Sequence, residues 1–309
     1  MATRFSNTLI AANDTNAHIQ GWAQFIEDTL VTTGGWVVTG DTGQTLPSAL
    51  TLTNGVDQKK GYRIYRMSDA LQATYPVFMR LDFGSNGVGA TAPGVWVTIG
   101  TGSDGAGNIT NILYQPPGVH AAFGSGSSTT LANNSYGSAA PNRFTLGMFV
   151  LSATLSLEMA FGLERTKDSS GNDTGAGLLF MYGGGILGTT SLGGASRITA
   201  YSYLIYAGGV QPTMEPNSIH VLTYQNPTQS FGGSIGIGVP IPMRGVAQQP
   251  GMNWCLARTS DIAVQGSFSM TMYGQTVGYQ GLEANTVIVS TVGNTGTNAD
   301  ASRTCMRYD

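Results

Sequence analysis

The hydrophobic pattern predicts one helix near the start of the chain, followed by strands and turns. Five apolar side chains recur at the spacing of a single helical face: Ile19, Trp22, Phe25, Ile26 and Leu30. Asp14 or Thr15 can cap the start of this helix, and Gly34 and Gly35 follow its last turn, where a left-handed residue is favoured. An apolar stripe of this kind has to pack against a sheet or a neighbouring subunit.

Beyond residue 35 the chain has the pattern of many short strands punctuated by glycine. One of them, 76–83, alternates so that every second residue is apolar, while Arg80 and Asp82 lie on the other face. We expect that second face to be half exposed or covered by another subunit. The predicted strands are 36–39, 61–67, 76–83, 95–101, 155–165, 176–182, 197–207, 220–225, 234–242, 256–264, 267–273 and 286–292.

These elements predict a mainly β fold, with sandwich or barrel-like sheets and one amphipathic N-terminal helix. The expected divisions are an arm and helix over 1–35, a first β region over 36–118, a Gly/Ser-rich loop or boundary over 119–145, and a second β region over 146–309. One continuous domain fits the same pattern. The arm over 1–13 would suit a strap between subunits.

Charged residues are scarce in this chain, which bears on how much of its surface is exposed to solvent. Charged residues make up 10% of the 309 residues, against about 25% in ordinary soluble domains. Hydrophobic residues make up 41%, which is enough for a packed core and argues against disorder. Because surface charge opposes association, we expect much of this surface to be covered by copies of the chain or by partners.

Several partners and compartments are disfavoured by composition. The net charge of −3 and the small basic group around Lys59, Lys60, Arg63 and Arg66 do not favour nucleic acid, and we expect a solvated strand edge there. Apolar runs of the length of a signal peptide or a membrane span are missing, so we expect synthesis in a cytoplasm without membrane insertion. The two cysteines have no zinc-type spacing; a disulfide between them and two separate buried thiols both fit, at Cys255 and Cys305.

Two Asp-Thr-Gly triplets, at Asp41 and Asp173, suggest an aspartic protease, in which two adjacent carboxylates share a proton. The neighbouring residues argue against this class. Gly40 and Asn172 precede the triplets, where that family has bulky apolar residues, and the second triplet lies in a polar hairpin turn. We therefore expect no catalytic residue here, and we keep the protease as a remote alternative.

Other motifs have simpler interpretations. The glycine loop 100–105 precedes a turn and a strand where a dinucleotide site needs a helix, and the GxSxG sequence over 232–236 is followed by prolines. Asp168 and Asn172, with Asp173, lack the order of a calcium loop, so we expect no metal or cofactor. The remaining candidates are the three histidines, which have no catalytic context, and a set of tyrosines that could stack on a glycan: His18, His120 and His220; Tyr182, Tyr201, Tyr203 and Tyr206.

Three stretches carry a family resemblance: QGWAQFIEDTLVTTGGWVVTGDTGQT (20–45), GYRIYRMSDALQATYPVFMRLDFGS (61–85) and PGVWVTIGTGSDGAGNIT (93–110). Together they resemble uncharacterised virion structural proteins of tailed bacteriophages, of the tail or fibre type, over about a third of the chain. The resemblance implies a particle component without enzymatic activity, and it carries no site residues across.

The expected function is therefore that of a structural subunit, in the tail or at the head–tail attachment, assembling with itself and other virion proteins. Its expected location is the virion, after assembly in the host cytoplasm. A capsid decoration protein and a receptor-binding fibre that contacts host glycan are the alternatives.

Overall fold

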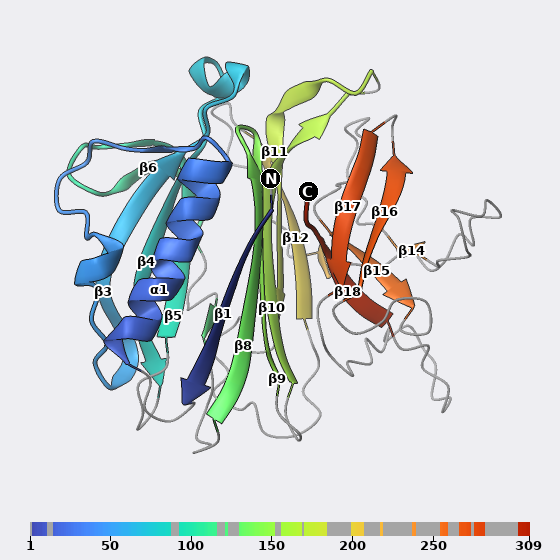
Figure 1. Ribbon diagram of the computed structural model, residues 1–309. Coiled ribbons are helices and arrows are strands. Elements are labelled where there is room, and N and C mark those ends of the chain that lie inside the picture. The colour runs from blue at the N-terminus through green and yellow to red at the C-terminus, as the bar shows by residue number, and fades with distance from the viewer. Residues whose placement is uncertain are drawn as a thin grey trace.

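The computed structural model describes residues 2–10, 15–87, 93–115, 121–122, 130–151, 156–168, 170–183, 199–206, 217–218, 237–238, 254–258, 266–272, 275–281 and 302–309. Within these residues the chain is mainly β, with three antiparallel sheets and one helix near the N-terminus (Figure 1). The predicted fold class is confirmed. Each sheet runs between two edge strands, so none of the three closes into a barrel among the described residues.

The first sheet has six strands and lies on the left in Figure 1. Its main path runs β2-β3-β4-β5-β6, and β7 pairs with one end of β5. Most of the strands predicted between residues 36 and 101 are found in it. The bounds are β2 Val37–Val38, β3 Gly55–Arg66, β4 Phe78–Gly87, β5 Pro93–Ser103, β6 Ile109–Tyr114 and β7 Ala121–Ala122.

The second sheet has seven strands in the order β1-β8-β9-β10-β11-β12-β13 and occupies the middle of Figure 1. The hairpin predicted around residues 168–173 is confirmed as the β10–β11 connection. The bounds are β1 Ala2–Ile10, β8 Thr130–Ala140, β9 Arg143–Leu151, β10 Ser156–Lys167, β11 Asp173–Gly183, β12 Thr199–Tyr206 and β13 Asn217–Ser218.

The third sheet has five strands in the order β14-β15-β18-β17-β16, on the right in Figure 1. Strands β17 and β18 were not predicted, because neither contains a long run of β-branched or aromatic residues. The predicted strands 220–225 and 286–292 lie outside the described residues. The bounds are β14 Ile237–Gly238, β15 Trp254–Arg258, β16 Ser267–Met272, β17 Gln275–Gly281 and β18 Ser302–Arg307.

Two sequence predictions are wrong. The expected loop or boundary over 119–145 contains strand β8, and the expected arm forms strand β1, which pairs with β8 of the same chain. One position of β8 requires a small residue, because the end of the helix approaches Ala139 closely. A Cβ atom added at Gly34 would lie 2.4 Å from the Cβ atom of Ala139. A bulkier β-branched or aromatic residue at position 139 would be more typical of a strand, but it would not fit beside the end of the helix.

The N-terminal helix is confirmed, and it continues into a wider turn. α1 (Asn16–Glu27) begins after the extended residue Thr15, at one of the two predicted caps; the other, Asp14, lies outside the described residues. A π-helical segment, η1 (Asp28–Thr33), follows directly. It ends at Thr33 and is followed by Gly34 and by Gly35, whose φ of +73° is the left-handed conformation expected after the last turn. Two short 3₁₀ turns, η2 (Pro47–Ala49) and η3 (Ala70–Ala73), lie in later loops.

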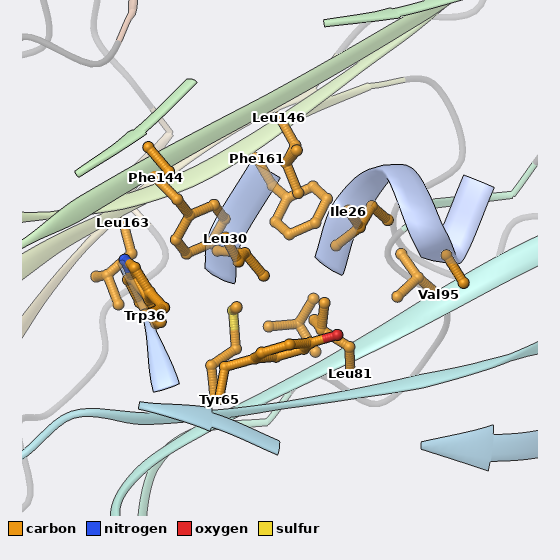
Figure 2. Close-up of a cluster of buried hydrophobic side chains, with 14 of the residues drawn as sticks. Ile26, Leu30, Trp36, Tyr65, Leu81, Val95, Phe144, Leu146, Phe161 and Leu163 are labelled. Atoms are coloured by element: carbon orange, nitrogen blue, oxygen red, sulfur yellow. The ribbon is translucent and has the colours of Figure 1, made fainter. Parts of the chain in front are cut away.

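The α1–η1 segment is buried between the first and second sheets, and this interface forms the main core (Figure 2). Ile26 and Leu30 lie between side chains of both sheets in that view. Trp22 meets Phe83 of β4 edge to face, with ring centroids 6.4 Å apart. From the second sheet, the helix is covered by Phe144, Leu146, Phe161 and Leu163, and from the first by Tyr65, Met79, Leu81, Phe83, Val95 and Val97.

Hydrogen bonds and an ion pair around this core join parts of the chain that are far apart in sequence. The indole N–H of Trp36 donates to the carbonyl oxygen of Ala140 at 2.9 Å, which fixes the end of the helix to the β8–β9 turn. Arg165 of β10 donates two hydrogen bonds, of 2.9 and 3.0 Å, to the carboxylate of Asp69 beside η3. The side chain of Arg165 is fully buried, so this ion pair joins the two sheets in a dry environment.

We predict that Leu30→Ala lowers the free energy of unfolding by about 2–5 kcal/mol, because it removes a fully buried side chain and leaves a cavity between two sheets. Denaturant unfolding followed by far-UV circular dichroism measures this change. Leu46→Ala is the matched control: Leu46 is 59% exposed, so its loss should change stability by less than about 0.5 kcal/mol. Equal effects of the two substitutions would contradict the proposed position of Leu30 in the core.

Candidate functional site

The outer face of the first sheet, opposite the helix, carries a polar cluster that includes Asp41, one of the predicted site residues. Register places Tyr62 of β3 opposite Asp82 of β4, and Arg80 is on the same face. Arg80 donates to Asp82 from Nε at 3.1 Å, and its guanidinium lies 3.9 Å from the ring centroid of Tyr62. This face was predicted to be half exposed or covered by another subunit; Phe78 and Arg80 are half-buried there, and Asp82 is buried by its neighbours.

Asp41, the first candidate of the protease hypothesis, belongs to this cluster. Its Oδ2 atom accepts a 2.8 Å hydrogen bond from Ser103, and its Oδ1 atom accepts one of 3.2 Å from the backbone N–H of Gly107. Burial acts to raise the pKa of Asp41, but the donors around the carboxylate, Thr39 first and then Ser103 and the backbone of Gly107, outweigh it and lower the pKa below the ordinary 3.8. Asp41 is therefore an ionised acceptor that holds its loop against the β5–β6 turn.

Asp173, the second candidate, lies at the start of β11 in the other main sheet. Its Oδ1 atom accepts from the ammonium group of Lys167 at 2.8 Å, and its Oδ2 atom accepts from the side-chain amide of Asn142 at 2.6 Å. All four oxygens of Asp41 and Asp173 are thus occupied by different donors. The structure does not bring the two carboxylates together as the proton-sharing pair that an aspartic protease requires.

The β5–β6 and β10–β11 hairpins end in the same five-residue turn, Asp-x-x-Gly-Asn. In the first, Oδ1 of Asp104 accepts from the backbone N–H groups of Ala106 and Asn108. In the second, Oδ1 of Asp168 accepts in the same way from Ser170 and Asn172. The glycine of each turn has a positive φ, +99° at Gly107 and +84° at Gly171. This repeat does not stand out in the sequence, because only three of its five positions, the Asp, the Gly and the Asn, are identical.

This shared turn accounts for two of the motifs considered above. The glycine loop 100–105 enters the first turn, and the turn and strand expected after it are confirmed, as a hairpin of β5 with β6. The acidic group at 168–173 forms the second turn, in which Asp168 is bonded to backbone N–H groups. These hydrogen bonds lower the pKa of Asp104, through Asn108 first, and of Asp168, through the backbone of Asn172 first. Among the described residues, no three His, Cys, Asp or Glu side chains gather to hold a metal ion.

The remaining candidates do not form one site. Strand register places Tyr182 and Tyr206 on one face of the second sheet and Tyr201 and Tyr203 on the other, so the four tyrosines do not share a platform. His18 is buried in the helix, whereas His120, His220 and the GxSxG sequence lie outside the described residues.

The basic residues that were predicted to share a strand edge have separate surroundings in the structure. Arg63 forms an ion pair with Glu27, at 2.7 Å from Nε to Oε2, and is therefore not part of a solvated edge. Lys59 lies 5.4 Å from the ring centroid of Trp96. An open hollow of about 520 Å³ lies beside η3 and includes Arg66, but Asp69 and Gln72 on its wall already bind Arg165 and the backbone of Val77.

A second polar cluster joins the second and third sheets. Arg143 of β9 donates to Asp309 at 2.7 Å, and Arg307 at the end of β18 donates to the same carboxylate at 2.8 Å. Burial, followed by the charge of Arg307, lowers the pKa of Arg143 to about 10, so Arg143 stays charged near neutral pH. Tyr308 meets Tyr136 edge to face, with centroids 5.4 Å apart. These contacts attach β18 to the face of the second sheet that is turned away from the helix.

No protein-family model matches the chain, and neither a curated protein nor a solved structure is detectably similar to it. None of the helices in the described part of the chain has the length and apolar character to span a membrane.

We predict that Asp41→Asn lowers the free energy of unfolding by about 1–2 kcal/mol at pH 7, because it replaces a charged acceptor of two hydrogen bonds. The folded-state pKa of Asp41 lies below the unfolded value near 3.8. Its contribution is therefore present above that pH and is lost as the pH falls through the folded-state pKa. The difference between variant and wild type should thus shrink below about pH 3.8, as measured by denaturant unfolding at several pH values.

Ser103→Ala is the matched variant, because it removes one donor to Asp41 and leaves the carboxylate in place. It should reproduce part of the loss at pH 7, with the same pH dependence. A difference between Asp41→Asn and wild type that persists unchanged in acid would contradict this assignment. Cleavage of a peptide at low pH that depends on Asp41 would restore the protease hypothesis.

Proposed function

We propose that this chain is a structural subunit of a bacteriophage particle, in the tail or at the head–tail attachment, and that it assembles with copies of itself and with other virion proteins. The particle type rests on the resemblance of residues 20–110. The surface supports assembly, chiefly through the way in which the few charges of this chain are paired.

Much of the scarce charge is paired within the chain. At least six of the 14 Lys and Arg residues bind acidic side chains at 2.5–2.9 Å. One of these pairs, Arg165 with Asp69, is almost completely buried. The surface therefore keeps less charge than the low total of 10% suggests. Because a surface with little charge opposes association only weakly, this pairing favours a subunit that is covered in its working state.

The edges of the first sheet support the same proposal. Its two edge strands, β2 and β6, each expose an apolar side chain: Val37 is 37% exposed and Ile112 is 45% exposed. An edge strand offers unpaired backbone groups to another chain, and charged side chains are one of the devices by which proteins protect such edges. Neither β2 (Val-Val) nor β6 (Ile-Thr-Asn-Ile-Leu-Tyr) contains a charged residue.

We predict that the full-length chain self-associates at micromolar concentration, and that its association is nearly insensitive to salt between about 0.1 and 1 M, because apolar contacts and backbone bonds are not screened. Sedimentation velocity over a range of concentrations measures this. A stable monomer at every concentration would overturn the assembly proposal. Strong weakening by salt would show that ion pairs drive the association.

Ile112→Asp should weaken self-association by about tenfold or more if β6 lies in the interface, since a buried unpaired charge is costly. Thr53→Asp, at an exposed loop position, is the matched control and should leave association unchanged. A cryo-electron microscopy map of the intact particle would locate the chain on the tail or on the capsid surface. A capsid position would favour a decoration protein, and a fibre-tip position would favour receptor binding.

A further inference from the structure

The two cysteines of the chain lie directly opposite each other on neighbouring strands. Cys255 of β15 pairs with Cys305 of β18 in a regular antiparallel register, with Trp254 opposite Met306 and Leu256 opposite Thr304. The sequence left open whether these cysteines meet, because they are separated by about 50 residues. The strand pairing brings together the only two thiols of a chain of 309 residues.

Opposite positions on antiparallel strands have the dimensions that a disulfide requires. Their Cα atoms lie about 4.5 or 5.5 Å apart, depending on the type of pair, and their Cβ atoms lie about 4.5–5.5 Å apart on the same face. A disulfide needs a Cα separation of about 4.4–6.8 Å and a Cβ separation near 4 Å. Little or no movement of the strands is therefore needed.

The position of β18 gives such a bond a structural consequence. β18 is the central strand of the third sheet, between β15 and β17. Directly after Cys305, the chain reaches Arg307, Tyr308 and Asp309, whose contacts with Arg143 and Tyr136 attach it to the second sheet. A bond at Cys305 would therefore tie the third sheet to the strand that docks on the rest of the molecule.

We propose that Cys255 and Cys305 form a cross-strand disulfide when the chain folds in oxidising surroundings, and that this bond locks the third sheet. Two thiols lose two protons and two electrons to a disulfide oxidant such as oxidised glutathione, which is reduced to two thiols. Cys305 is a buried thiol in this structure. The bond therefore closes as the sheet assembles, and it is protected from reductants afterwards. This inference is independent of the proposed role in a virion.

The test is to produce the full-length chain in bacterial cells with an oxidising cytoplasm and in ordinary cells with a reducing cytoplasm. Each sample is denatured and alkylated at its thiols, before and after treatment with dithiothreitol, and analysed by peptide mass spectrometry. We expect chains from oxidising cells to resist alkylation until they are reduced, and to yield one cross-linked peptide pair containing Cys255 and Cys305. Chains from reducing cells should be alkylated at both positions.

Closing a loop of about 50 residues should favour the folded state by on the order of a thousandfold, seen as a higher denaturant midpoint in the oxidised sample. In Cys255→Ser, the midpoints from the two kinds of cell should coincide. The matched control is Cys255→Ser with Leu256→Cys, which keeps two thiols but moves one to the opposite face of the strand. It should form no bond within the chain.

Two alkylated cysteines in chains from oxidising cells would overturn the proposal. A disulfide that joins two chains, visible as a dimer in a non-reducing gel, would also overturn it. A bond that forms equally well in the face-shifted control would show that strand register does not direct the pairing, and would reject the proposed geometry.

Discussion

The fold depends on the burial of one helix between two sheets. Most surface helices show one apolar stripe to one partner, but α1 and η1 are covered by β4 on one side and by β1 and β8 on the other. This double contact explains features that would otherwise be unrelated. Gly34 and Ala139 are small where the end of the helix touches β8, and Trp36 reaches the β8–β9 turn with its N–H group. The buried pair of Arg165 and Asp69 joins the two sheets beside the same core.

The features that could be predicted from the sequence are those decided by neighbouring residues. The helical stripe from Ile19 to Leu30, the alternation along β4 and the polar hairpin after Lys167 all express local periodicity or turn chemistry. Strand β8 could not be predicted in this way, because its Gly, Ser and Ala residues do not typify a strand, and the small size of Ala139 suits a helix end that lies about a hundred residues earlier in the chain. The pairing of β1 with β8 has no local signal at all, so the sequence pattern of the first residues fits an arm that straps a neighbouring subunit equally well.

Prediction of the candidate site from the sequence was limited by a different ambiguity. Turns that bind cations or phosphates and turns that bind their own backbone use the same residues, chiefly Asp, Asn and Gly. The structure shows that Asp104 and Asp168 accept hydrogen bonds from backbone N–H groups. It also shows that Asp41 and Asp173 accept hydrogen bonds from separate donors. The scarcity of charge was visible from composition, but its internal pairing was not. Arg165 and Asp69 are 96 positions apart, and no spacing rule connects them.

The pairing of β1 with β8 also constrains how the chain is made. Ala2 lies opposite Ser138, so more than a hundred further residues must be synthesised before β1 can pair with β8. At the usual pace of translation this interval is on the order of ten seconds. During this interval, the hydrophobic face of helix α1 is not yet covered by the second sheet. Folding on the ribosome is therefore discontinuous for this protein: the first sheet can form early around one side of the helix, and the nascent chain closes its core only after β8 and β9 emerge.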